Sequence, residues 1–182
     1  LAMPSLRIDG WIFNWSLLPL VLLIACVHTL DALGAHVGAQ KLADAKIQGM
    51  LGHFNSGTSI PASRVYAEAG IPQIAMATSP QYTAQGFKTT FRAMTSDTQQ
   101  GGVMGSFAVG KLQAKAIAII DDRTAYGQGL ADEFEKAVKA AGGNVVKREF
   151  TNDKAVDFRA ILTSIKKANA DLIFFGGADA QG

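Results

Sequence analysis

Two groups of small hydroxyl residues are the side chains best suited to bind a small anion. The first is the run Asn55-Ser56-Gly57-Thr58-Ser59, and the second is the pair Thr78-Ser79. Hydroxyls and free backbone N–H groups beside the start of a helix can hold an anion without water. A carboxylate suits such donors, because its oxygens accept several hydrogen bonds while the helix dipole supplies partial positive charge. The alternative is ordinary helix capping by Ser and Thr.

Side chains that could react lie in the same kinds of loop, but simpler structural roles explain them. His53 and Ser56 could form a base beside a nucleophile, whereas we favour a polar residue that closes a loop at a strand end. Asp121 and Asp122 could form a carboxylate pair with split pKa values. We interpret them as a loop and helix cap, because no other acid–base or metal group accompanies them. We therefore expect no catalysis, no metal and no cofactor.

Two glycine-containing patterns fall short of nucleotide-binding motifs. Residues 105–111, GSFAVGK, match a phosphate-binding loop up to the lysine, but Leu112 stands where a hydroxyl must hold Mg²⁺. The pattern also lies inside a predicted helix, where its small residues favour close packing. Residues 127–129, GQG, lack the third glycine of a dinucleotide fingerprint and a strand immediately before them.

The composition is that of a globular protein without a nucleic-acid footprint. The chain has 182 residues, 48% of them hydrophobic, which is enough for one domain or two small ones. Its 17 basic and 15 acidic side chains are scattered and give a formal net charge of +2, so we expect no nucleic-acid partner. The single cysteine, Cys26, excludes disulfides within the chain and leaves the redox compartment undetermined.

Residues 1–37 form an atypical apolar segment. No Asp, Glu, Lys or Arg occurs from residue 10 to residue 30, while Arg7 precedes this run and small residues follow it at 32–35. This order is typical of a secretory signal, and Cys26 has the setting of an acylated lipoprotein cysteine. A single membrane anchor of about twenty residues, or a buried helix, is the alternative. The segment therefore predicts export or membrane anchoring.

From residue 38 onward, short apolar runs alternate with helical patterns, which is the signature of repeated βαβ units. We predict strands at 47–51, 71–76, 91–92, 116–120, 145–150 and 172–175, and helices at 37–46, 61–69, 97–111, 126–141 and 157–168. The run 116–120 is wholly apolar, which predicts a strand covered on both faces. The helix 97–111 is expected to turn inward its large apolar side chains, Val103, Met104, Phe107 and Leu112.

The predicted fold class is therefore α/β, with Rossmann-like parallel sheets and flanking helices. In such sheets ligands bind beyond the carboxyl ends of the strands, where loops meet the starts of helices. The loops in that position are 53–59, 77–80, 121–126 and 176–180. Both hydroxyl groups lie in these loops.

Five segments together resemble the branched-chain amino acid binding proteins of bacterial ABC importers. They are GHFNSGTSIPAS at 52–63, GIPQI at 70–74, GFKTTFR at 86–92, DDRTAYGQG at 121–129 and FFGG at 174–177. The resemblance covers about residues 38 to 180, and several motifs in register make it specific. It implies a periplasmic protein with a periplasmic-binding-protein-like architecture of two α/β lobes. The lobes would close on one amino acid, and the protein would deliver it to a membrane permease.

The resemblance also implies roles for particular residues. Ser56, and Thr78 with Ala77 beside it, would receive the α-carboxylate of the ligand in the first lobe. Tyr126 would lie over the ligand from the second lobe, and Asp179 would approach the same cleft. We expect residues 38–112 to form part of lobe one and residues 113–182 part of lobe two, an incomplete two-lobe architecture.

Two departures from the family predict a fragment. Residues 1–37 do not resemble the family's first strand, and the sequence ends at Gly182, inside the second lobe. The acidic partner of the ligand's ammonium group belongs to the absent part, so affinity for a free amino acid should be poor or absent. The neighbour of the absent first strand should be left unpaired.

We interpret the chain as the substrate-binding component of an importer for a leucine-like amino acid, as a fragment of one. Three alternatives stay open at this point. The chain could be a ligand-sensing domain of a receptor or regulator with the same fold. It could be an enzyme built on Ser56 and His53, or a remnant without function.

Overall fold

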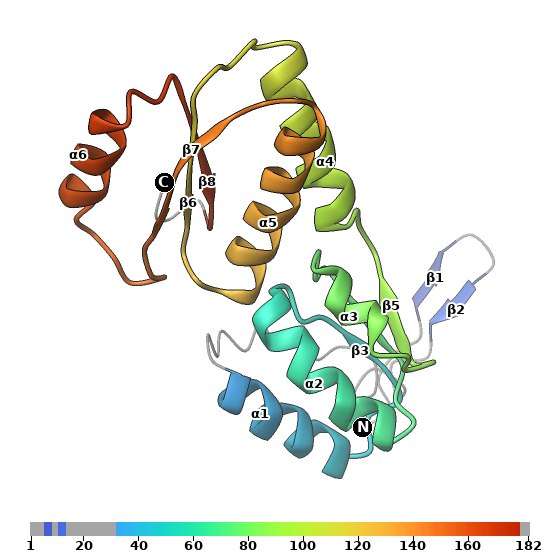
Figure 1. The fold of residues 1–182 in the computed structure, drawn as a ribbon. Coiled ribbons are helices and arrows are strands. Elements are labelled where there is room, and N and C mark those ends of the chain that lie inside the picture. Colours follow the sequence, from blue (N-terminus) through green and yellow to red (C-terminus); the bar gives the residue numbers. More distant parts are fainter. Residues whose placement is uncertain (1–5, 9–10, 14–31, 179–182) are drawn as a thin grey trace.

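The computed structural model describes residues 6–8, 11–13 and 32–178. Within them lie two parallel three-stranded sheets and one antiparallel pair of short strands. The elements in chain order (Figure 1) are β1 (Leu6–Ile8), β2 (Trp11–Phe13), α1 (Ala32–Asp44), β3 (Met50–Leu51), α2 (Ser56–Glu68), β4 (Gln73–Ala75), α3 (Pro80–Ala84), β5 (Thr90–Arg92), α4 (Asp97–Gly110), β6 (Ile117–Asp121), α5 (Ala125–Ala140), β7 (Val145–Phe150), α6 (Arg159–Lys167) and β8 (Leu172–Gly176). The predicted α/β class is confirmed.

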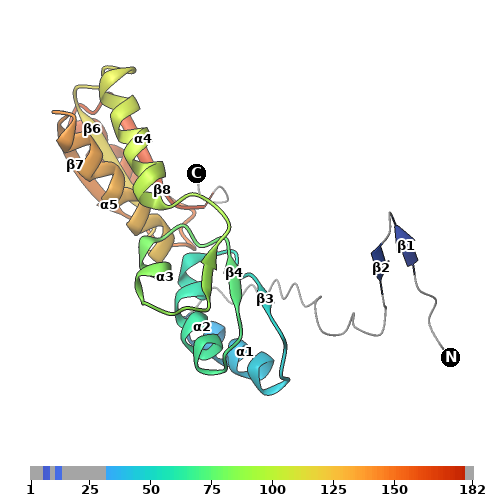
Figure 2. The same ribbon diagram turned by 90° about the vertical axis from the view of Figure 1, so that its right-hand side faces the viewer.

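The first sheet has the strand order β3-β4-β5, and its described helices pack on one face. Met50 of β3 packs against α2, and α1 packs on the other side of α2. Figure 2 shows the helices on one side of these strands. On the opposite face Leu51, Ile74 and Phe91 stand in register across the three strands and are 53%, 43% and 51% exposed.

β3 lies at an edge of this sheet, because among the described residues it pairs only with β4. The expectation that this strand lacks its neighbour stays a prediction, because residues 14–31 lie outside the described part of the chain. The strand is also shorter than the predicted range 47–51.

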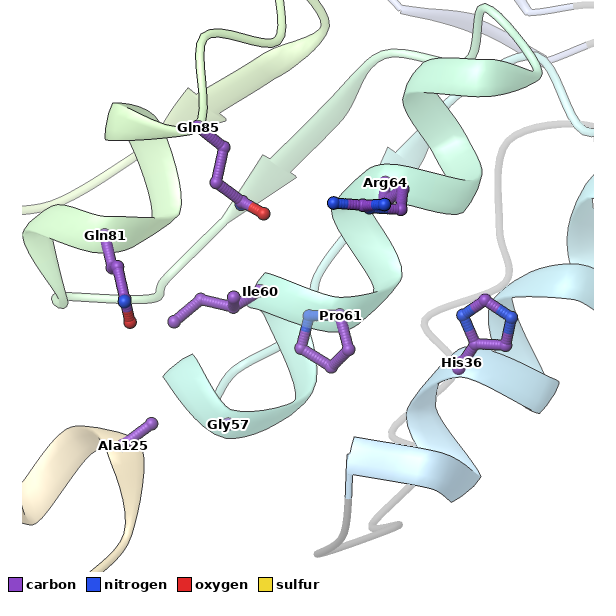
Figure 3. Close-up of a pocket in the computed structure, with 8 residues that line it drawn as sticks. All are labelled: His36, Gly57, Ile60, Pro61, Arg64, Gln81, Gln85 and Ala125. Carbon is purple, nitrogen blue, oxygen red and sulfur yellow. The ribbon is translucent and has the colours of Figure 1, made fainter.

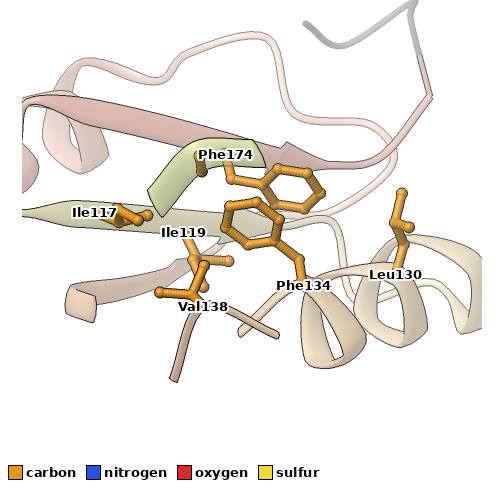
Figure 4. Packing of buried hydrophobic residues seen from close by; sticks show 8 residues of the cluster. Ile117, Ile119, Leu130, Phe134, Val138 and Phe174 are labelled. Carbon is orange, nitrogen blue, oxygen red and sulfur yellow. The ribbon is translucent and has the colours of Figure 1, made fainter. Parts of the chain in front are cut away.

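The second sheet has the order β7-β6-β8, and its central strand is buried at every position. One face packs on α4 and α5, and the other packs on α6. Phe134 of α5 stacks on Phe174 of β8 with ring centroids 3.8 Å apart (Figure 4). The prediction that the apolar run at 116–120 forms a strand covered on both faces is confirmed.

The predicted inward face of α4 is wrong. Val103 and Phe107 are 65% and 52% exposed, and Met104 and Leu112 are exposed as well. The buried residues along α4 include Gly101, Gly105 and Ala108. α4 and α5 lie so close that a Cβ atom at Gly105 would be only 2.8 Å from the carbonyl oxygen of Phe134. The small residues of the GSFAVGK pattern thus serve helix packing, as expected.

The predicted start of α2 is also wrong. The helix begins at Ser56 and not at Pro61, because Asn55 is its N-cap and accepts a hydrogen bond from Gly57 N at 2.8 Å. Proline favours the first helical position, but here it lies in the second turn. Its missing N–H leaves one helical hydrogen bond unmade without ending the helix.

Candidate binding site

The start of α2 and the loop after β4 meet through a hydrogen bond. Ser79 N donates to Ser56 Oγ at 3.2 Å. Ser56 is the first residue of α2, where backbone N–H groups have no helical acceptor. Its own hydroxyl proton is not used in this contact and can donate to another group. The structure therefore brings together the two hydroxyl groups singled out in the sequence.

The loop after β4 carries polar groups without protein partners. Among the described residues, the backbone N–H groups of Ala77 and Thr78 have no backbone acceptor. The buried hydroxyl oxygen of Thr78 makes no hydrogen bond of good geometry, although the Asp97 carboxylate lies beside it. Because buried polar groups in proteins are nearly always hydrogen-bonded, these donors mark a position that suits the oxygen atoms of a ligand.

Two other hydroxyls of the first group are already occupied. Thr58 Oγ1 donates to the Asn55 carbonyl at 2.9 Å, and Ser59 Oγ donates to the His53 carbonyl at 3.2 Å. Both fold back on the turn that starts α2, so they stabilise the helix start and do not face a ligand. Of this group, Ser56 alone combines its position beside the 77–79 loop with an unused hydroxyl proton.

The loop before α5 positions Tyr126. Thr124 is the N-cap of α5, and its N–H and hydroxyl both donate to Asp122 Oδ1, at 2.9 and 2.7 Å. Burial raises the pKa of Tyr126; the nearby carboxylates of Asp97 and Asp122 raise it further, and a hydrogen bond with Gln100 lowers it. Asp122 therefore holds the N-cap residue of α5 in place, as the capping interpretation expected.

Asp97, the first residue of α4, lies beside the candidate site and was missed at the sequence level. Its backbone N–H donates to the Thr78 carbonyl at 2.8 Å. Its carboxylate is fully buried, and neither oxygen has a hydrogen-bond partner of good geometry. Burial raises the pKa of Asp97, while the neighbouring Thr78 hydroxyl and Arg92 lower it. An acidic residue in a first helical turn is so ordinary that the sequence gives no reason to single it out.

The predicted site residues are thus placed unequally. Ser56 lies beside the loop that holds Ala77 and Thr78, and Ala77 is fully buried. Asp97 is a neighbour of both Thr78 and Tyr126. Asp179 lies outside the described residues, so its role stays a prediction.

The base-and-nucleophile alternative finds no support in the geometry. His53 Nε2 lies 3.4 Å from the hydroxyl of Tyr66, and no hydrogen bond joins His53 to Ser56 among the described contacts. Asp121, one member of the possible carboxylate pair, forms an ion pair with Arg148, whose Nη2 lies 2.8 Å from Asp121 Oδ2. Both groups have structural partners.

His53 predicts a pH-dependent stability. Burial lowers the pKa of the folded-state imidazole below 6.5, so the unfolded chain binds this proton more readily. The contribution of His53 to stability should be constant above the pKa of His53 in the unfolded chain. It should fall as the pH is lowered from that pKa towards the lower pKa of His53 in the folded chain. Urea midpoints measured between about pH 7.5 and about pH 5.5 should fall in the native chain and fall less in His53→Gln. The control is His36→Gln at the exposed His36, which should keep the native slope; equal slopes in all three proteins would contradict the assignment.

A cavity of about 490 Å³ lies beside the candidate site but is not the same place. Figure 3 shows that α1, α2, α3 and the start of α5 line it. Its lining includes Gly57 and Ala125, the chain neighbours of Ser56 and Tyr126, but neither of those residues. Arg64 and His36 also line the cavity, and both side chains are exposed.

Comparison with known proteins identifies the family of this chain. The sequence matches the family described as periplasmic binding protein over residues 21–182. The chain belongs to the periplasmic binding protein family. The family is one of substrate-binding proteins and not of enzymes.

Relatives of this periplasmic binding protein include amino acid binding proteins. It is 44% identical over 140 residues to the Leu/Ile/Val-binding protein homolog 1 of Brucella abortus, covering 76% of this chain and 38% of that protein. It resembles the structure of a leucine binding protein from Thermotoga maritima, with a TM-score of 0.74, 28% identity and coverage of 79% and 41%. It also resembles a branched-chain amino acid transporter substrate binding protein from Streptococcus pneumoniae in complex with isoleucine, with a TM-score of 0.68, 26% identity and the same coverage of 79% and 41%.

The chain spans about 38% of the length of the curated relatives it matches. No helix in the part of the chain that the structure describes is long and apolar enough to cross a membrane. Residues 14–31, which hold most of the apolar run behind the anchoring prediction, lie outside that part.

Proposed function

We propose that this chain is part of the substrate-binding protein of an ABC importer and receives the carboxylate of a branched-chain amino acid. The observation that carries the proposal is the group of unpartnered donors at Ala77 and Thr78 beside the start of α2. Backbone N–H groups at a helix start attract negative charge and fix the position of a carboxylate.

The proposed arrangement uses both lobes. The carboxylate accepts from the N–H groups of Ala77 and Thr78 and from the hydroxyls of Thr78 and Ser56. Tyr126 covers the ligand from the second lobe, and Asp179 approaches from the end of β8. We take the lobe boundary near residue 112, as expected from the sequence.

The proposed ligand and partners follow from the relatives. The Brucella abortus relative is named for leucine, isoleucine and valine, and the Streptococcus pneumoniae structure contains isoleucine. The partner is the membrane permease of an importer, and the location is the periplasm, reached by export. Movement of the lobes around the ligand, and not a reaction, is the working step.

Calorimetric titration of the purified chain with leucine, isoleucine and valine tests this function. We expect weak binding of at least one of them, because the partner of the ammonium group is not among these residues. Ser56→Ala and Thr78→Val should weaken it by a further factor of about 10 to 100, because a hydrogen bond to a charged group contributes about 1.5–3 kcal/mol. Circular dichroism establishes that each sample is folded.

Ser106→Ala is the matched control, since Ser106 is an exposed serine on α4. It should bind as the native chain does. A folded native chain that binds none of the three amino acids would overturn the proposal. So would Ser56→Ala and Thr78→Val variants whose affinities equal that of Ser106→Ala.

A further inference from the structure

We propose that Arg92 is the positioning residue that holds the 77–79 loop with its N–H groups facing the carboxylate of the ligand. The inference rests on the function proposed above. Arg92 Nη1 points at three successive carbonyl oxygens, those of Ala77, Thr78 and Ser79, at 3.4, 3.4 and 2.9 Å. Arg92 Nη2 donates to Thr83 Oγ1 at 2.8 Å, which fixes the plane of the guanidinium.

Peptide geometry turns this contact into an orientation of the donors. In a trans peptide the C=O and the following N–H point in opposite directions. The carbonyls of Ala77 and Thr78 face Arg92, so the N–H groups of Thr78 and Ser79 point away from it. The Ser79 N–H indeed donates to Ser56 Oγ on the other side. The neighbouring Thr78 N–H is the donor left free for a ligand.

The sheet holds Arg92 itself in place. Arg92 is the last residue of β5 and stands opposite Ala75 in the parallel ladder with β4. The loop it contacts begins two residues after Ala75, so one ladder fixes both the guanidinium and the start of the loop. The side chain is partly buried, which reduces solvent screening of its charge.

The charge of Arg92 also strengthens the donors. A cation on the oxygen side of a peptide group polarises it and makes the N–H a better donor. Lysine cannot replace this arrangement, because an ammonium is a compact point charge without the planar fork that reaches Thr83 and the carbonyls together.

The test compares leucine with leucinamide, which lacks the carboxylate, by calorimetry on the full chain. Arg92→Met should weaken leucine binding about 10-fold or more and leave leucinamide binding nearly unchanged, because only leucine has the carboxylate that the oriented N–H groups bind. Arg92→Lys should lose most of the same selectivity. Thr83→Val removes the contact to Nη2, together with a long hydrogen bond of 3.5 Å from Thr83 Oγ1 to the Pro80 carbonyl, and should shift the ratio in the same direction by less.

Arg64→Met is the matched control, because it removes one positive charge from an exposed position on α2. It should keep the native ratio of leucine to leucinamide affinity. If the native chain binds leucine but Arg92→Met and Thr83→Val keep that ratio, or lose both ligands equally, the positioning role is wrong and the proposed function stands. If the native chain binds no leucine, the function fails and this inference fails with it.

Discussion

Arg148→Met is expected to lower the free energy of unfolding by about 3 kcal/mol, because it leaves the buried Asp121 carboxylate without its nearest cation. Arg148 Nη2 lies 2.8 Å from Asp121 Oδ2, and the Asp121 carboxylate is fully buried. The nearest remaining cation would be Arg123, whose Nε is 3.7 Å from the other oxygen. Urea unfolding followed by circular dichroism at neutral pH measures the change.

Two further variants separate the buried charge from the loss of an arginine. Arg159→Met removes an exposed ion pair with Asp157 and should leave the unfolding midpoint unchanged. Adding Asp121→Asn to Arg148→Met should restore part of the lost stability, because the amide has no charge to leave unpaired. If Arg148→Met behaves like Arg159→Met, the ion pair does not stabilise the fold as described. The pair matters for the site because Asp121 ends β6, at the beginning of the loop that leads to Tyr126.

Gly105→Ala should destabilise the protein by about 1–3 kcal/mol, although alanine favours helices over glycine. The added Cβ would lie 2.7 Å from the Cβ of Ala137 and 2.8 Å from the carbonyl oxygen of Phe134. Both belong to α5, and one of these atoms is backbone, so the two helices must move apart. Thermal unfolding measures the loss.

Gly102 on the same helix is the matched control, because a Cβ atom there would meet nothing within 4 Å. Gly102→Ala should therefore raise the stability by about 0.5–1 kcal/mol through helix propensity alone. Opposite signs for the two substitutions are the expected result. A stabilising Gly105→Ala would mean that α4 and α5 are not packed as closely as described.

Local patterns in the sequence predicted the second sheet well. The range 145–150 coincides with β7, and α5 ends where Gly142 adopts a φ of +79°. These elements are strongly patterned, because a run of apolar residues or a glycine after a long amphipathic helix leaves few alternatives. The meeting of Ser56 with the 77–79 loop could also be foreseen, because adjacent parallel strands end at the same edge of a sheet.

Features that depend on distant partners could not be predicted. The large side chains of α4 appeared to be its core face, but α5 approaches through the glycines instead. Arg92 and Asp97 carry no local mark of their contacts with the 77–79 loop, which lies more than ten residues away in the sequence. Pro61 suggested a helix start because proline favours the first helical position. The true N-cap, Asn55, is recognised only from its extended backbone and its hydrogen bond with Gly57 N.

The position of α4 has a mechanical consequence. Its first N–H is bonded to the carbonyl of Thr78, while the body of the helix is packed on α5. A helix of fourteen residues is about 21 Å long, so α4 connects the 77–79 loop to a distant part of the second sheet through one regular element. The Thr78–Ser79 peptide therefore joins α4 to α2, because its carbonyl accepts from Asp97 N and its N–H donates to Ser56 Oγ. In the binding mode proposed above, a rotation of α4 with the second sheet would displace this peptide and change the contacts to the carboxylate.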